Sequence, residues 1–216
     1  MHFRRLLTIL SVMCVSLAAG STAFAQSPAP KEPAHWGVAA SVAPWRANGF
    51  FKGLYEAQAL DLSGGEIRFG VTRGSTRGGE WSLLFVRKTI KEGGTMTDPF
   101  GDRYVMGPDV VLTGVMAETF GAFVHIANRA EIGLVLGGGV ARVSGTVRQV
   151  PNGTMVDPKT ILTFFAKETP VQFLGRAELA VAIAAAPGMK IRFSGGLNWP
   201  GSTRFSVTAL YFFGEK

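Results

Sequence analysis

The 216-residue sequence is poor in side chains that bind metals or react as nucleophiles, with one cysteine and three histidines. The cysteine, Cys14, lies in an N-terminal segment that we expect to be removed, which would exclude a disulfide, thiol catalysis and a cysteine metal site. His35 and His125 are far apart and form neither a His-x-His nor a Glu-x-x-His pattern, so a metal site is disfavoured. We expect no metal and no cofactor.

Long apolar runs are also missing beyond residue 25, where no stretch approaches the about 18 residues that a membrane-spanning helix needs. Hydrophobic residues nevertheless make up 47% of the chain. Glycine accounts for 28 of the 216 residues, nearly twice the usual share of roughly 7%. A transmembrane β-barrel would reconcile these observations, because only every second residue of its strands faces lipid.

The N-terminus has the three parts of a secretory signal peptide. Arg4 and Arg5 supply positive charge, residues 6–19 are almost wholly apolar, and Ala23-Phe24-Ala25 offers a cleavage site. An uncleaved anchor helix is the alternative, although the apolar run is short for a membrane span. We expect a signal peptide over 1–25, a proline-rich leader over 26–34 and a barrel domain over 35–216.

The mature chain would be basic. Removing 25 residues leaves 216 − 25 = 191, and losing Arg4 and Arg5 leaves a net charge of 20 − 15 = +5. The cations are scattered singly rather than gathered into a stripe, so we expect no nucleic-acid partner. Outer-membrane lipid and the phosphates of lipopolysaccharide are the expected anionic neighbours. The sequence does not fix the oligomeric state, and a monomer is expected.

Eight segments alternate apolar with small or polar residues, the period of two that predicts strands. They span 36–43, 66–72, 81–88, 111–126, 131–136, 176–186, 190–197 and 205–211. The sixth is rich in alanine and could also form a helix, but Pro187-Gly188 ends it early and favours a strand. Alternation alone does not separate a soluble sandwich from a membrane barrel.

The connections between these segments alternate in length. Long connections at 46–63, 92–103 and 149–167 follow the first, third and fifth segments, and short turns at 74–78, 127–129 and 187–188 follow the others. The last connection, 199–201, is short. Short periplasmic turns and long outer loops are typical of transmembrane barrels. The sequence therefore predicts an all-β, eight-stranded antiparallel up-and-down transmembrane barrel.

The chain resembles the outer-membrane-protein β-barrel domain superfamily of small bacterial barrels. The residues that carry this resemblance are 35–40, 64–70, 132–140 and 204–213. It implies a barrel fold, an outer-membrane location and recognition by the barrel assembly machinery. Such barrels usually end on an aromatic residue, whereas here Phe213 is followed by Gly214-Glu215-Lys216, so that signal is displaced.

Charged residues recur on the polar face of the predicted strands. We expect them inside the barrel, where they would pair with one another and fill a narrow interior. Ligand contact at one mouth and an ion pathway are the alternatives. The candidates are Glu66, Arg68, Glu118, Glu131, Arg176, Glu178, Lys190 and Arg192.

Aromatic residues lie near the ends of the segments, as in the two girdles of a membrane barrel. The alternative is that they are ordinary core residues. The candidates at the periplasmic end are Trp36, Trp81, Phe123, Tyr211, Phe212 and Phe213; those at the outer end are Trp45, Tyr104, Phe173 and Trp199. In the first long connection, Phe50, Phe51 and Tyr55 could form a sticky lip for lipid or a surface partner, or pack on the rim.

Catalysis is not expected. The run His125-Ile126-Ala127-Asn128 resembles the motif of outer-membrane lipid A deacylases, but Ala127 occupies the place of the serine and has no hydroxyl to activate. Gly79-Glu80-Trp81 matches the G-x-W of soluble lipocalins, although it opens the third strand rather than the first. We expect a structural or surface-binding and lipid-binding barrel; a lipid-modifying enzyme and a soluble carrier are the alternatives.

Overall fold

The computed structural model describes residues 33–47, 58–98, 100–126, 129–156, 171–199 and 201–215. The predicted signal peptide, most of the leader, and the loop candidates Phe50, Phe51 and Tyr55 lie outside these ranges. Within them the chain is built from β-strands and turns, and no helix there is long and apolar enough to cross a membrane.

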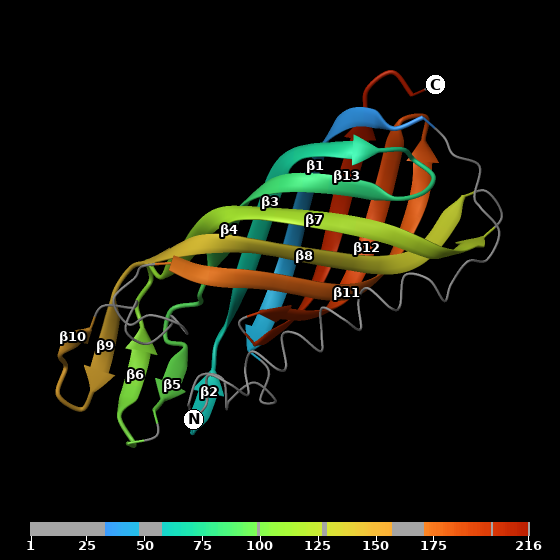
Figure 1. Cartoon of the computed structure of the whole chain (residues 1–216). Helices are drawn as coiled ribbons and strands as arrows, with labels where there is room; N and C mark the ends of the chain where they lie inside the picture. Colours follow the sequence, from blue (N-terminus) through green and yellow to red (C-terminus); the bar gives the residue numbers. More distant parts are fainter. Residues whose placement is uncertain are drawn as a thin grey trace, which may run out of the picture. The chain divides into compact units, whose positions relative to one another are not determined.

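Eight antiparallel strands close into a barrel in the order β1-β13-β12-β11-β8-β7-β4-β3, with β3 pairing back to β1 (Figure 1). The strands are β1 His35–Ala47, β3 Ser63–Gly74, β4 Glu80–Thr89, β7 Val111–Ile126, β8 Ala130–Ser144, β11 Val171–Ala186, β12 Met189–Trp199 and β13 Ser202–Phe212. Neighbouring barrel strands are consecutive in the chain, except that the last, β13, pairs with the first, β1, so the predicted up-and-down barrel is confirmed. The alanine-rich segment is a strand, β11.

The alternation in the sequence becomes an alternation between the two faces of the barrel wall. On β4, Trp81, Leu83 and Phe85 are exposed on the outside, whereas Ser82 and Leu84 are buried inside. β13 alternates in the same way along its whole length. Successive side chains of a strand point to opposite faces, so the sequence pattern directly decides which residues line the interior.

The two ends of the barrel differ. At one end, which we call the turn end, short turns join β3 to β4, β7 to β8 and β11 to β12. Gly188 adopts a left-handed conformation there, with φ of 70°, which suits the tight turn after Pro187. At the opposite end, the loop end, lie the three long connections and the short β12–β13 turn, and in Figure 1 it points to the lower left.

The three long connections contain a second sheet that the sequence did not predict. Its order is β10-β9-β6-β5-β2, and all its pairs are antiparallel. The strands are β2 Ala59–Asp61, β5 Thr95–Thr97, β6 Arg103–Met106, β9 Val147–Val150 and β10 Met155–Val156. Gln149, where the third long connection was expected to begin, is therefore part of a strand. These strands hold two to four residues each, too few for alternation to be recognised.

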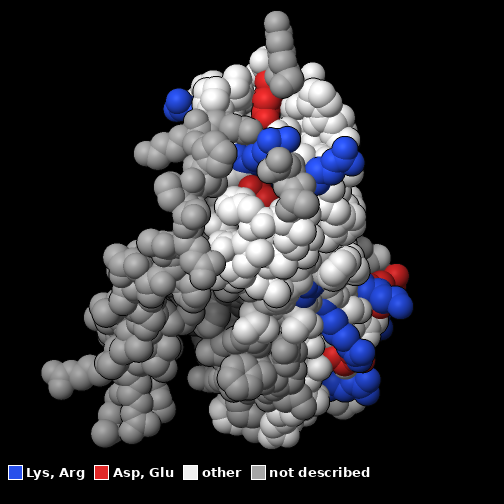
Figure 2. All heavy atoms as spheres, turned by 90° about the vertical axis from the view of Figure 1, so that its right-hand side faces the viewer, with Lys and Arg blue, Asp and Glu red and all other residues white. Residues whose placement is uncertain are grey.

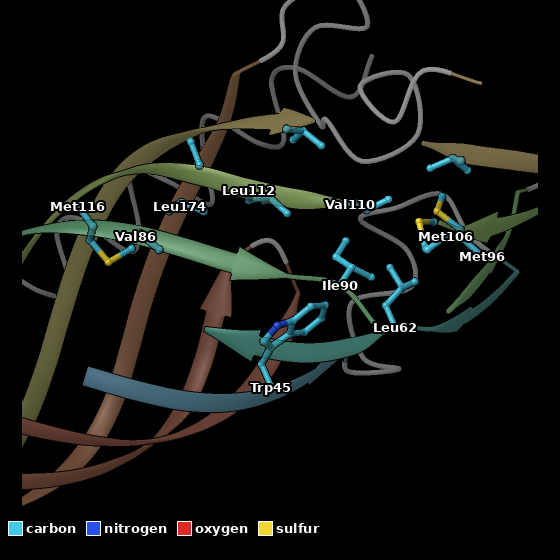
Figure 3. Packing of buried hydrophobic residues seen from close by; sticks show 13 residues of the cluster. Trp45, Leu62, Val86, Ile90, Met96, Met106, Val110, Leu112, Met116 and Leu174 are labelled. Carbon is cyan, nitrogen blue, oxygen red and sulfur yellow. The ribbon is translucent and has the colours of Figure 1, made fainter. Parts of the chain in front are cut away.

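An apolar cluster joins this small sheet to the loop end of the barrel. Met116 and Val86 project from the barrel strands, and Met96 and Met106 from the small sheet (Figure 3). Trp45, Leu62 and Ile90 lie between them in the same cluster. Burial of this apolar surface anchors the small sheet to the barrel.

Candidate functional site

The outward face of the barrel wall is apolar. Val42, Phe69 and Leu179 are more than half exposed, and similar side chains follow on every barrel strand. Among the described residues of the barrel strands, the charged side chains that face outward are Arg46, Arg73, Arg87 and Arg142, each within two residues of a strand end. Figure 2 shows a broad uncharged area between charged groups near the top and at the lower right of its face.

The barrel interior has the opposite character. All eight charged candidates from the sequence lie inside, each no more than 5% exposed. Glu80, Lys88 and Arg204 join them, although the sequence did not single them out. Their alternation with Trp81, Arg87 and Phe205 along the strands is the signal that could have placed them inside. The described interior thus holds five carboxylates and six cations.

Arg176 lies at the centre of the interior network. Its guanidinium donates to the Glu178 carboxylate at 2.6 Å and to the Glu118 carboxylate. Glu118 also accepts from Arg192 at 2.5 Å and lies 3.3 Å from Arg68. Ser194 donates a hydrogen bond of 2.7 Å to Glu178. Each buried charge of this group therefore faces opposite charge from more than one strand.

A second group of charges closes the turn end. The Lys190 ammonium lies 2.9 Å from Glu80 and 3.4 Å from Glu131, and it donates to the Gly78 carbonyl at 2.8 Å. Arg192 contacts the other oxygen of Glu80. Because Arg192 also contacts Glu118, this group is continuous with the central one.

At the loop end, Glu66 pairs with Arg68 and Arg204, and Arg204 lies 3.2 Å from Glu178. Lys88 is the exception. It donates to the Ser202 hydroxyl at 3.1 Å and lies 4.0 Å above the Trp45 ring, but no carboxylate of the described residues is within ion-pair distance. Lys88 sits opposite Glu66 in the strand register.

This network fills the interior. An eight-stranded barrel is only wide enough to be packed with side chains, and charges taken out of water are tolerated only when they are paired and hydrogen-bonded. Phe120, Phe212 and Leu210 add apolar groups to the same interior. The described interior therefore resembles a plugged core more than a channel.

The aromatic residues divide between the two faces. Trp36 and Trp81 face outward at the turn end, with ring centroids 5.5 Å apart, and Tyr211 meets Phe213 at 5.7 Å. Trp45 does not face outward: it is buried in the loop-end cluster, and its indole N–H donates to the Thr89 carbonyl at 3.1 Å. Trp45 is an even number of residues from the inward-facing Ser41 and Ala43 on β1, so its side chain points to the same, inward face.

Two further aromatic candidates also differ from expectation. Phe212 points into the barrel and is fully buried, because it alternates with the exposed Tyr211 and Phe213. Tyr104 belongs to β6 of the small sheet rather than to the barrel wall, and its hydroxyl donates to Asp98 at 3.2 Å. Trp199 and Phe173 lie near the loop-end termini of β12 and β11.

A hollow lies on the outside of the wall near the loop end. It has a volume of about 870 Å³ and is lined by residues of β1, β3 and β13, with Thr89 and Lys91 at its side. A smaller hollow of about 400 Å³ shares Pro44, Gly65 and Thr89 with it and extends towards Val42 and Ile67. Together they form one depression, which we call the wall groove.

His125 lies beside a buried glutamate. His125 Nδ1 lies 3.1 Å from Glu131, directly across the β7–β8 pair, while Ala127 and Asn128 lie outside the described residues. In the part of the chain that the structure describes, no three His, Cys, Asp or Glu side chains gather in a way that could hold a metal ion.

No family model and no curated protein sequence matches the chain. Among solved structures, Neisserial surface protein A is similar, with a TM-score of 0.51 and 13% identity over 84% of this chain and 100% of that one. The attachment invasion locus protein of Yersinia pestis, with the heparin analogue sucrose octasulfate and without it, gives TM-scores of 0.41 and 0.42 at 9% identity, with the same coverage. The chain has the fold of the small bacterial outer-membrane β-barrels.

Proposed function

We propose that the protein is an outer-membrane barrel with a structural or surface-binding and lipid-binding role, and that it is not an enzyme. The observation that carries the proposal is the reversed polarity of the wall. Apolar side chains face outward along every barrel strand, whereas Glu and Arg side chains are buried inside. Lipid favours this arrangement and water opposes it.

The orientation follows from the lengths of the connections. In transmembrane barrels the short turns face the periplasm and the long loops lie outside. On this basis the turn end faces the periplasm, and the small sheet of β2, β5, β6, β9 and β10 projects from the cell surface. Export would use the predicted signal peptide over 1–25, and insertion would use the barrel assembly machinery.

The alternatives fit less well. A soluble lipocalin-like carrier needs an apolar interior and a charged exterior, the opposite of the observed faces. A lipid-modifying hydrolase needs a hydroxyl beside a base, and His125 instead faces Glu131. The plugged interior favours a barrel that conducts no solutes, and the chain is proposed to act as a monomer.

The proposal is tested by expressing the full-length chain in a Gram-negative host and comparing boiled with unboiled outer-membrane fractions on a detergent gel. A closed barrel keeps its strands paired in detergent until it is heated, so its band should shift on boiling. Mass spectrometry should find Gln26 at the N-terminus. A soluble periplasmic product without a shift would overturn the proposal.

A further inference from the structure

The part of the wall groove beside β13 is built from three rows of outward residues on β1, β3 and β4, with Lys91 just beyond the end of β4. Val42, Ile67 and Arg87 form the row nearer the turn end. Arg46, Ser63 and Lys91 form the row nearer the loop end, where the Lys91 amide donates to the Ser63 carbonyl at 2.8 Å.

Pro44, Gly65 and Thr89 form the row between them, linked by the pairing of Pro44 with Gly65 and by hydrogen bonds between Gly65 and Thr89. The middle row is low because Gly65 has no side chain. The depression therefore follows from one residue on β3.

Packing does not require the glycine at this position. A Cβ on Gly65 would meet only Thr89 Oγ1, at 3.6 Å, which is an ordinary contact. On the adjacent Gly64 a Cβ would lie 1.9 Å from the Thr89 carbonyl oxygen, so that glycine is enforced. Glycine inside a strand weakens the strand and often marks a place where a ligand approaches the backbone closely. Because packing does not require Gly65, we infer that the space above it is used for binding.

Exposed cations lie around the groove. Arg46, Arg87 and Lys91 line it, and the one carboxylate among the described lining residues, Glu66, is buried inside the barrel. Asp61 pairs with Arg46 at 3.4 Å with both side chains largely exposed, and such a pair exchanges readily with another anion. Arg87 and Lys91 lie four residues apart, on either side of Thr89, the last residue of β4, and fully extended backbone would separate their Cα atoms by about 13 Å.

The walls of the groove are apolar. Val42 is 59% exposed, Phe205 57% and Ile67 48%. A ligand that matches the groove thus combines an apolar chain with two anionic groups, separated by about the distance between Arg87 and Lys91. A phospholipid offers one phosphate at a single point, whereas the phosphorylated disaccharide of lipid A carries a phosphate at each end and acyl chains along its length.

We propose that the wall groove binds lipopolysaccharide, with an acyl chain of lipid A over Gly65 and its phosphates on Arg87, Lys91 and Arg46. The inference rests on the proposed function, which puts the loop end in the outer leaflet. Arginine suits this role because its guanidinium binds a phosphate through two parallel hydrogen bonds.

The test uses the full chain purified from outer membranes in mild detergent, stripped of lipid and titrated with purified lipopolysaccharide. Lipid A without phosphates and phosphatidylglycerol serve as the comparison ligands. We expect lipopolysaccharide to bind at least roughly tenfold more tightly than either. Equal binding of dephosphorylated lipid A would overturn the phosphate contacts, and equal binding of phosphatidylglycerol would overturn the choice of lipopolysaccharide.

Two pairs of variants locate the site. Arg87→Gln should weaken lipopolysaccharide binding roughly tenfold, whereas Arg73→Gln, an outward arginine at the turn end, should leave it unchanged. Gly65→Leu should fill the groove and reduce binding, whereas Gly138→Leu, an open outward glycine on β8, should not.

Every variant is first checked for the shift on boiling, so that loss of folding is separated from loss of binding. A wild-type chain that shifts on boiling, together with unchanged binding by both Arg87→Gln and Gly65→Leu, would overturn the groove and leave the outer-membrane proposal intact. A wild-type chain that does not shift would overturn both proposals.

Discussion

At the scale of single residues, the most constrained side chains are the buried ions. Arg176 and Glu178 contact each other inside the barrel, and Arg176 also donates to Glu118. Removing one member of such a pair leaves the other charge buried without its partner, which costs about 3–5 kcal/mol. Removing both members avoids most of this penalty.

We therefore predict that Arg176→Gln and Glu178→Gln each lower the free energy of unfolding by about 3–5 kcal/mol. The double variant should be less destabilised than either single variant. Glu118 keeps Arg192 and Arg68 in the double variant, and Arg204 keeps Glu66. Urea unfolding in lipid vesicles measures the three values.

A double variant whose loss equals the sum of the two single losses would contradict the pairing. Asn198→Ala provides a control for general disturbance of the site, because it removes a neutral donor 2.8 Å from Glu178 and leaves every charge in place. Its loss should be about 1–3 kcal/mol.

Individual side chains could be assigned to the inner or outer face of the barrel from the sequence wherever the alternation along the strand was used. Glu66, Arg176 and Lys190 lie inside, as expected from the apolar neighbours with which they alternate. Trp45 and Phe212 were expected in the wall because of their residue type, although their parity places them inside. The residues that contact one another across the interior could not be predicted, because those contacts depend on the shear of the closed barrel.

At the scale of elements, two adjacent glycines on β3 have opposite roles. A Cβ on Gly64 would collide with the Thr89 backbone, whereas one on Gly65 would not. We predict that Gly64→Ala lowers the free energy of unfolding by about 1–3 kcal/mol and that Gly65→Ala leaves it unchanged or raises it. The midpoints of urea unfolding in detergent micelles distinguish them; similar losses for both would contradict the role assigned to Gly64.

One exposed carboxylate joins the β6–β7 and β8–β9 connections, beside a backbone hydrogen bond from the Gly107 amide to the Thr146 carbonyl at 2.9 Å. Asp109 accepts hydrogen bonds from the Thr146 amide at 3.0 Å and from the Thr146 hydroxyl at 2.5 Å. These bonds, the hydroxyl bond first, hold the pKa of Asp109 below its ordinary value of 3.8. A lowered pKa stabilises the fold above the ordinary value, and this contribution is lost as the pH falls through the lowered pKa.

We accordingly predict that hydrogen exchange at the Thr146 amide is slow above about pH 4 and becomes faster, relative to other loop-end amides, as Asp109 is protonated at lower pH. Thr146→Val keeps the amide but removes the hydroxyl bond, so the change should move to higher pH. The same pH dependence in Asp109→Asn would show that another group is responsible.

Strands were predictable from the sequence where apolar and polar residues alternate over many positions. The barrel strands hold ten or more residues, so each repeats the period of two several times. The strands of the small sheet are much shorter, and β6 finds its partner β9 in a different connection. That sheet depends on the barrel bringing the three connections to one end, which no local pattern reports.

At the scale of the whole molecule, the alternating pattern fits two opposite architectures, one with the apolar faces buried and one with them exposed. The lengths of the connections favour the second, and closure of the barrel around the Glu–Arg network agrees with it. The energetic consequence is that the outward face is stabilised by contact with lipid rather than with water. A charge introduced on the outward face should therefore lower the free energy of unfolding more than the same charge would on the surface of a water-soluble protein.

This consequence leads to a prediction that depends on depth. Leu179 lies near the middle of β11, between Leu134 and Gly195, and Ile183 lies near the turn end, beside Ala130. Leu179→Arg should cost about 2–4 kcal/mol and impair assembly, whereas Ile183→Arg should cost about 0–1 kcal/mol, because the penalty falls towards the membrane interface. Leu179→Ala, which removes apolar volume without adding charge, is the matched control.

The shift on boiling measures assembly, and urea unfolding in vesicles measures the loss in free energy of unfolding. Normal assembly of Leu179→Arg, Val181→Arg and Ile183→Arg alike would mean that this face does not contact lipid.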